Sequence, residues 1–401
     1  METQNSEYQA AIMPTYGRID LSFVRGEGCY LITDDNIRYL DCASGIAVNT
    51  LGHCHPKLVE TLSNQAHTLW HTSNLYRIPD QERLAFRLAQ ACKLDHVFFC
   101  NSGAEANEAS VKMARRFQYR QNKQDKTTIL CASGAFHGRT LGMLSATANP
   151  AYREGFGPSV AGFEHVAFGN LNELRAAINE KTAAIMIEPV QGEGGANAAP
   201  DGYLQGLREA ADEFGVLVIA DEVQTGMGRT GSLFAFQQYG IQPDIVALAK
   251  GLGGGIPVGA VVARADIGNA MGPGSHGSTF GGNPLAMAVA NSVVDVLQED
   301  GFLQHVQEIS SYLNTYLVKL SEQYPSLIKE IKGLGLLRGI GLQECFAAAD
   351  LSSALRDKHI LTVQAGLNTL RIIPPLIITK SEIDILCNAL TICFEEKSHE
   401  L

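Results

Sequence analysis

The chain has 401 residues, more than one compact core usually holds, which favours two domains of unequal size. Hydrophobic residues make up 45% of it and charged residues 18%, which argues against extensive disorder. The formal net charge of −11, without a basic run or stripe, argues against a nucleic-acid or anionic-membrane partner.

The first ten residues contain two glutamates and no apolar core, and no stretch approaches the ~20 apolar residues of a membrane span. We therefore expect neither a secretory signal nor a membrane partner. The nine cysteines are scattered and form no Cys-x-x-Cys pair, which favours a reducing cytoplasm. His53-Cys54-His55 is too closely spaced for a usual zinc site and leads into Pro56, a helix-start residue, so no metal site is expected.

Between about residues 95 and 265, short apolar runs alternate with longer amphipathic segments. Strands are expected at 97–100, 128–131, 183–187, 216–220, 245–248 and 258–262, and helices at 104–119 and 203–214. Continuous apolar strands indicate a sheet that is covered on both faces. Their alternation with helices predicts a mostly parallel α/β sheet.

The chain changes character from about residue 300. A long helix is expected over 303–324, followed by short strands near 336–342 and 370–373 and by a closing helix. We interpret residues 300–401 as a smaller α+β domain, which the N-terminal segment 1–55 joins. Residues 56–299 then form the large α/β domain.

Polar residues follow several strands, and ligands of open α/β sheets bind at the carboxyl ends of the strands. Ser102 and Glu105 suit a capping box before the helix at 104, and free backbone N–H groups there also suit a phosphate. Asp221 follows the most apolar strand and could pair with a cation, while Val223 could support one face of a flat ring. Acidic residues at such places also serve as metal ligands or loop caps.

Lys250 ends the next strand. Burial there would lower the pKa of its amine and make it nucleophilic, whereas a solvated loop lysine is the more common case. The glycines that follow it lack the third glycine of a dinucleotide loop. The small-residue loop 277–284, with Ser278 and Thr279, could hold a phosphate or form a simple turn.

The order and spacing of these clusters resemble the fold-type I pyridoxal-phosphate enzymes. The strings at 101–108, 136–140, 188–195 and 221–231 resemble those of the class III (subgroup III) aminotransferases, and the similarity extends over essentially the whole chain. The resemblance implies an α/β transferase with pyridoxal 5′-phosphate as its cofactor.

The resemblance also implies the catalytic roles. Lys250 would carry the cofactor covalently and move the proton during transfer, and Asp221 would keep the pyridine nitrogen protonated. Phe136 and Val223 would pack on the two faces of the ring, and Gln224 would bond near its phenolic oxygen. The full set of implied cofactor-binding residues is Ser102, Gly103, Ala104, Phe136, Asp221, Glu222, Val223, Gln224, Lys250 and Thr279. Thr279 would reach the phosphate of a neighbouring subunit, which implies a homodimer with cofactor sites at the interface.

Arg139 and Arg371 point to carboxylate substrates, because a guanidinium grips a carboxylate with two hydrogen bonds. Glu193 resembles the glutamate that pairs with the second of these arginines in one half-reaction and releases it in the other. An ω-amine donor places no carboxylate near Arg371, whereas glutamate and 2-oxoglutarate do. Ser278 completes the expected substrate-binding set.

Within the family, the strings at 44–49, 226–231 and 276–284 resemble the acetylornithine aminotransferases of arginine biosynthesis. Gly45 leaves room for an acyl group near the place where ornithine δ-aminotransferases carry a tyrosine, although bacterial 4-aminobutyrate aminotransferases also have glycine there. Succinylornithine, ornithine and 4-aminobutyrate aminotransferases remain alternatives. A racemase or decarboxylase on the same scaffold is a further one.

Overall fold

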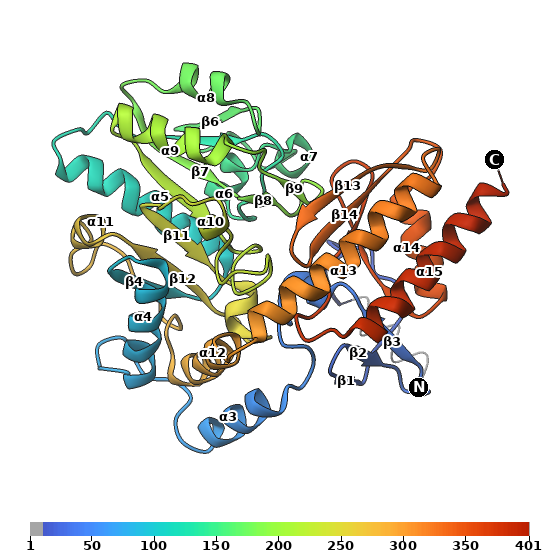
Figure 1. Cartoon of the computed structure of the whole chain (residues 1–401). Coiled ribbons are helices and arrows are strands. Elements are labelled where there is room, and N and C mark those ends of the chain that lie inside the picture. The colour runs from blue at the N-terminus through green and yellow to red at the C-terminus, as the bar shows by residue number, and fades with distance from the viewer. Residues whose placement is uncertain (1–10, 401) are drawn as a thin grey trace.

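The structure is a computed structural model that describes residues 11–400, so the expectation about the first ten residues lies outside it. In Figure 1 the chain forms two lobes, one coloured mainly light blue to yellow and the other orange and red. Within the described residues, no helix is long and apolar enough to cross a membrane.

A seven-stranded sheet forms the centre of the larger lobe, and its strand order is β4-β12-β11-β10-β7-β5-β6. The strands are β4 (His96–Cys100), β5 (Thr128–Ala132), β6 (Phe163–Val166), β7 (Thr182–Ile187), β10 (Leu217–Asp221), β11 (Ile245–Leu248) and β12 (Gly259–Ala263). β12 runs antiparallel to both neighbours, while the other neighbouring pairs are parallel. The expected mostly parallel α/β sheet is confirmed. The strand expected at 258–262 proves to be antiparallel, and β6 was not among the expected strands.

Strand β10 shows why these strands are apolar throughout. Leu217 and Ile219 belong to the core that includes helix α5 (Gly103–Arg120), whereas Val218 and Ala220 belong to the core that includes helix α9 (Tyr203–Phe214). Both faces of the sheet are therefore covered by helices, as its continuous apolar strands predict. Helix α9 ends before Gly215, whose φ of 61° lies in the left-handed region that favours glycine.

Other elements between residues 44 and 297 connect or cover these strands. The helices are α2 (Ser44–Ala47), α3 (Pro56–Ala66), α4 (Pro79–Cys92), α6 (Leu141–Ala146), α7 (Pro150–Arg153), α8 (Leu171–Ala177), α10 (Ala235–Gln238), α11 (Ala265–Asn269) and α12 (Pro284–Leu297). A two-stranded sheet joins β8 (Val190–Gln191) to β9 (Asn197–Ala198), and a 3-10 turn, η1 (Lys250–Gly253), follows β11.

The C-terminal part builds the smaller lobe around an antiparallel sheet of order β13-β14-β17-β16. Its elements are α13 (Phe302–Gln323), β13 (Ile328–Leu334), β14 (Leu337–Leu342), α14 (Ala348–Asp357), β15 (Ile360–Leu361), β16 (Val363–Ala365), β17 (Thr369–Ile372) and α15 (Lys380–Ser398). The long helix, the two expected strands and the closing helix are confirmed.

The N-terminal strands lie against this smaller lobe (Figure 1). They are β1 (Arg25–Glu27), β2 (Tyr30–Ile32) and β3 (Arg38–Asp41). Strand β15 pairs in parallel with β3, so one small sheet contains strands from both ends of the chain. This pairing supports our proposal that segment 1–55 joins a small domain of residues 300–401, with residues 56–299 as the large domain.

Candidate active site

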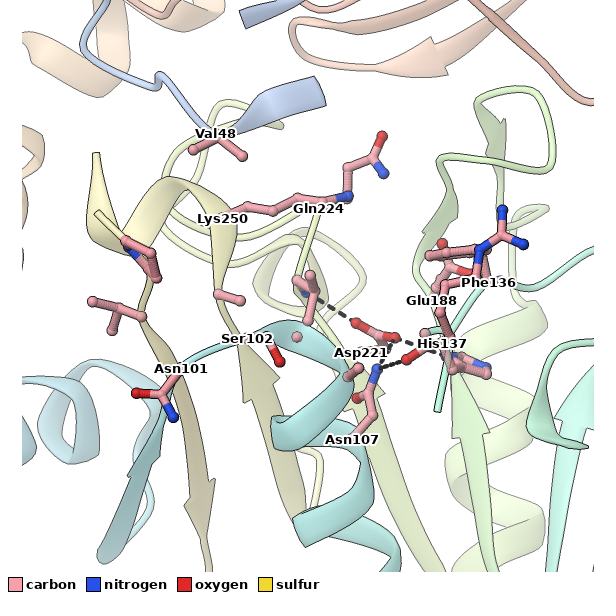
Figure 2. A pocket seen from close by; sticks show the side chains of 18 of the residues that line it. Val48, Asn101, Ser102, Asn107, Phe136, His137, Glu188, Asp221, Gln224 and Lys250 are labelled. Atoms are coloured by element: carbon pink, nitrogen blue, oxygen red, sulfur yellow. Dashed lines mark hydrogen bonds and ion pairs between the residues drawn. The ribbon is translucent and has the colours of Figure 1, made fainter. Parts of the chain in front are cut away.

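A cavity of about 440 Å³ opens at the carboxyl ends of the strands of the seven-stranded sheet (Figure 2). Its volume suits a small organic ligand. Nine of the residues expected at the site line it, namely Ser102, Gly103, Ala104, Phe136, Arg139, Asp221, Val223, Gln224 and Lys250. The sheet therefore brings together residues that are up to 148 positions apart in the sequence (from 102 to 250).

Asp221 lies at the floor of the cavity and is only 3% exposed. One carboxylate oxygen, Oδ2, lies 2.7 Å from Asn107 Nδ2 and 2.7 Å from His137 Nδ1, as the dashed lines in Figure 2 show. The other, Oδ1, accepts a hydrogen bond of 3.0 Å from the backbone N–H of Val223. Burial acts to lower the pKa of His137, but the hydrogen bond and charge of Asp221 outweigh it and raise that pKa. The floor is therefore a fixed negative group with three supports.

Asn107 and His137 were not among the site residues predicted from the sequence. Asn107 lies one helical turn after Gly103 on α5, and His137 lies between the two expected residues Phe136 and Arg139. For Asn107 a sequence signal existed, because it is a polar residue one turn into a helix whose first turn was expected at the site.

Glu188 is a second buried carboxyl group that the sequence analysis did not assign. It follows β7, and its two oxygens accept hydrogen bonds from Phe136 N at 2.7 Å and Gly192 N at 3.1 Å. Burial raises its pKa to about 7, although the neighbouring His137 acts in the opposite direction. Glu188 thus connects the loop that carries Phe136 to the loop that carries Glu193.

Lys250 begins the η1 turn directly after β11 and lines the cavity (Figure 2). Its φ of 43° is unusual for a residue with a side chain, and such strain is concentrated at functional sites. Burial lowers the pKa of its amine, while the charge of Glu193 acts to raise it. A larger share of neutral amine makes Lys250 a better nucleophile and base than a solvated lysine.

The first turn of α5 forms a second part of the lining. Ser102 Oγ accepts a hydrogen bond of 3.2 Å from Glu105 N, and Glu105 Oε2 accepts one of 2.5 Å from Asn101 N. The capping interaction expected for Ser102 is present, but Glu105 reaches back to Asn101 instead of Ser102. A Cβ atom added to Gly103 would lie 2.7 Å from Val223 Cγ1, so the backbone there packs as closely as a glycine allows. Gly103 and Ala104 line the cavity, and free N–H groups at the start of a helix can bind an anion there.

Arg371 and Glu193 form an ion pair beside the cavity. The Arg371 side chain is only 1% exposed, and its Nη1 lies 2.7 Å from Glu193 Oε1 and 2.9 Å from Gln224 Oε1. Burial acts to raise the pKa of Glu193, but Arg371 outweighs it and lowers that pKa. Gln224, expected near the phenolic oxygen of a cofactor, contacts Arg371 in this structure.

Glu222 is the cofactor-site candidate that faces away from the cavity. Its carboxylate accepts hydrogen bonds from the backbone N–H groups of Ala235 at 3.1 Å and Phe236 at 2.7 Å, and from Thr225 Oγ1 at 2.5 Å. Successive residues of a strand point to opposite faces, so Glu222 cannot share the direction of Asp221. It stabilises the start of α10 instead of lining the cavity.

Ser278 and Thr279 line a separate cavity of about 350 Å³. Asn101 lines both cavities, and its Nδ2 donates a hydrogen bond of 3.1 Å to Ser278 Oγ. These two candidates therefore lie next to the first cavity but outside its lining.

The family model described as aminotransferase class-III matches residues 12–394. The chain is 52% identical over 368 residues to an acetylornithine aminotransferase of Brucella melitensis, covering 92% of this chain and 91% of the relative.

Two solved structures are also similar. An ornithine aminotransferase of Toxoplasma gondii, reported with partial occupancy of pyridoxal phosphate at its active site, has a TM-score of 0.94 and 31% identity, covering 100% of this chain and 95% of its own. An N-acetylornithine aminotransferase of Stenotrophomonas maltophilia has a TM-score of 0.84 and 34% identity, with coverage of 96% and 98%. The expected fold-type I architecture is confirmed by these neighbours.

Proposed function

This chain belongs to the class-III aminotransferase family, and on that premise we propose that it transfers the terminal amino group of N2-acetyl-L-ornithine to 2-oxoglutarate. The products are N-acetyl-L-glutamate 5-semialdehyde and L-glutamate, and the reaction serves arginine biosynthesis. The cofactor is pyridoxal 5′-phosphate, for which the cavity offers a buried carboxylate, a helix start and a lysine.

The cavity residues fit this cofactor in distinct ways. When bound, pyridoxal phosphate supplies an electron sink for the negative charge that develops on the substrate carbon. The backbone N–H groups of Gly103 and Ala104, with Ser102, would hold the phosphate at the start of α5. Asp221 would hold a proton on the pyridine nitrogen, because a buried carboxylate stabilises a neighbouring positive charge.

Lys250 has two roles in the proposed reaction. Its amine would hold the cofactor in place, and with the substrate bound the same amine would take up the proton from the substrate carbon that carries nitrogen. The lowered pKa of Lys250, caused first by burial, favours the neutral form that both roles need. Phe136 and Val223 both line the cavity and would support the two faces of the ring.

The Arg371–Glu193 ion pair is the observation that carries the proposal for two chemically different substrates. While the terminal amine of the donor occupies the site, Glu193 neutralises Arg371. When 2-oxoglutarate enters, one of its carboxylates takes the place of Glu193 and Arg139 binds the other. An exchangeable partner lets one buried guanidinium serve both half-reactions, because a buried charge needs a partner in each.

We also propose that the protein forms a homodimer, in which Thr279 contributes to the cofactor site of the partner subunit. Thr279 lies outside the lining of this chain's own cofactor cavity. Large apolar side chains near it are exposed, among them Trp70 at 63%, Leu75 at 87% and Phe280 at 62%. Exposed apolar residues grouped in this way are typical of a protein interface.

We also propose that the enzyme works in the cytoplasm. All nine cysteines lie in the part of the chain that the structure describes, and there none is paired in a disulfide. Seven of the nine are buried, which leaves few thiols open to oxidation. Unpaired cysteines in this number fit a reducing compartment.

A donor panel with 2-oxoglutarate as acceptor tests the proposal, with L-glutamate formation as the readout. We expect N2-acetylornithine to give the highest kcat/KM among N2-acetylornithine, N2-succinylornithine, ornithine and 4-aminobutyrate. A higher value for ornithine or 4-aminobutyrate would contradict the proposed substrate, and no glutamate from any donor would contradict transamination itself.

A further inference from the structure

Arg139 lines the cavity and, unlike the neighbouring Arg371, has no charged partner. It is exposed, and its guanidinium carbon lies 3.8 Å from the centre of the Tyr152 ring and 5.3 Å from that of Phe136. Among residues 11–400, no carboxylate lies within ion-pair distance of Arg139 and no group accepts a hydrogen bond from its guanidinium. Its fixed contacts are therefore the faces of two aromatic rings.

Tyr152 makes the closer of these two contacts and is itself held in place. It lies on α7 (Pro150–Arg153), where Asn149 Oδ1 accepts a hydrogen bond of 3.0 Å from Ala151 N. Its ring meets that of Phe136 edge to face, with centres 6.0 Å apart and planes at 90°. This T-shaped arrangement is a favourable one for two aromatic rings. Tyr152 is thus fixed by its helix and by a residue of the cofactor cavity.

A ring face is a particular kind of partner for a guanidinium. The π system attracts the cation while it leaves the N–H groups at the edge of the guanidinium plane available for hydrogen bonds. An acidic partner would occupy the same N–H groups and would compete with a substrate carboxylate. An exposed arginine without any contact would sample many rotamers, and ordering it would weaken substrate binding.

We propose that Tyr152 is a positioning residue for the substrate carboxylate, because it holds the Arg139 guanidinium in place with its N–H groups free. The inference rests on the proposed function, in which Arg139 binds one carboxylate of each substrate. Tyr152 then raises affinity for carboxylates without contacting the reacting atoms. Its loss raises KM and leaves kcat almost unchanged.

Glutarate binding to the holoenzyme, measured by isothermal titration calorimetry, is the direct test, since this dicarboxylate has no reactive carbonyl. Tyr152→Ala and Tyr152→Leu should each weaken glutarate binding about three- to tenfold, the range expected when a freed long side chain must be ordered on binding. Tyr152→Phe should stay within about twofold of wild type, because it keeps the ring. Phe214→Ala is a matched control, since the Phe214 ring also contacts a guanidinium, with its centre 5.6 Å from that of Arg175, and lies outside the cavity lining.

A double-mutant cycle with Arg139→Gln separates this inference from the proposed function. In the Arg139→Gln background, Tyr152→Leu should have no further effect on glutarate affinity. An equal effect in both backgrounds, or wild-type affinity in Tyr152→Leu, would overturn the role of Tyr152 alone. If Arg139→Gln itself left glutarate affinity and both KM values unchanged, the carboxylate role of Arg139 would fall, and with it this inference.

Discussion

The charged residues at the floor of the cavity (Asp221) and at its rim (Arg139 and the Arg371–Glu193 pair) have different kinds of partner. At the floor, Asp221 is almost fully buried and has hydrogen-bond partners on both carboxylate oxygens. At the rim, Arg139 is exposed and contacts only aromatic rings, and the buried Arg371 has a partner, Glu193, that is itself 24% exposed. A buried charge needs a partner in every state. The partners of Asp221 are themselves buried and fixed, whereas the partly exposed Glu193 can be replaced by a substrate carboxylate.

This difference separates catalysis from selectivity. Fixed dipoles and charges lower a barrier because they need no rearrangement during the reaction, so changes at the floor should reduce kcat. Exchangeable contacts at the rim accommodate two substrates, so changes there should alter one half-reaction or one substrate.

Replacing Lys250 removes both the covalent attachment and the base. Lys250→Ala should lower transamination at least ~10³-fold, in line with general acid–base contributions, while pyridoxal phosphate still binds through the remaining cavity residues. Glutamate formation measures the first effect and the cofactor content after gel filtration the second. Borohydride reduction and peptide mapping should place the cofactor on Lys250 alone, and Lys319→Ala, an exposed lysine on α13, should behave as wild type. Label on another lysine would refute the assignment.

Asp221→Asn tests the floor more finely, because it removes a charge and keeps the shape. We expect kcat to fall about 100-fold, which corresponds to ~2.7 kcal/mol of transition-state stabilisation, together with weaker cofactor binding. Asp244→Asn is the matched control, since Asp244 is also buried but pairs with Arg208 and Arg264 at the other end of the sheet. It should lower thermal stability without a comparable loss of kcat. A change in KM alone for Asp221→Asn would show that the floor does not act in this way.

These two residues were accessible from the sequence because each follows a continuous apolar strand. The supports of Asp221 were only partly accessible. The place of Asn107 one turn into α5 was a signal, but its contact and that of His137 with Asp221, across 114 and 84 residues, arise only through the sheet order. The direction of Glu222 was accessible, because strand alternation places it opposite Asp221, yet the family resemblance outweighed that rule. The antiparallel direction of β12 was inaccessible, since a buried strand has the same apolar pattern in either direction.

The exchangeable pair at the rim should produce a smaller and one-sided effect. Glu193→Gln leaves Arg371 without its counter-charge while the amine donor is bound, and the donor half-reaction should slow about 30-fold. The 2-oxoglutarate half-reaction should change less than about threefold, because there the substrate carboxylate pairs with Arg371. Stopped-flow measurement of each half separates the two. Glu330→Gln, which removes an ion pair between the exposed Glu330 and the half-buried Lys332, is the control. Equal damage to both halves in Glu193→Gln would contradict the exchange mechanism.

The smallest expected effect concerns the choice of donor, and the backbone at Gly45 shapes its test. Gly45 has a φ of 60°, and Ser44, Ile46 and Ala47 on either side of it also have positive φ, so α2 is a left-handed turn. Wild-type enzyme should favour N2-acetylornithine over ornithine at least about tenfold in kcat/KM, or ~1.4 kcal/mol.

Gly45→Tyr should reverse part of this preference, because its ring would take the space proposed for the acyl group. Any side chain at this φ also strains the backbone by roughly 1 kcal/mol, which affects both donors alike. Gly45→Ala carries the same strain without the ring and is therefore the matched control. Steady-state kinetics with both donors, at saturating 2-oxoglutarate, should show a selective loss for N2-acetylornithine in Gly45→Tyr and an equal loss for both donors in Gly45→Ala. The same selective loss in Gly45→Ala would assign the preference to the turn itself and not to the space beside it.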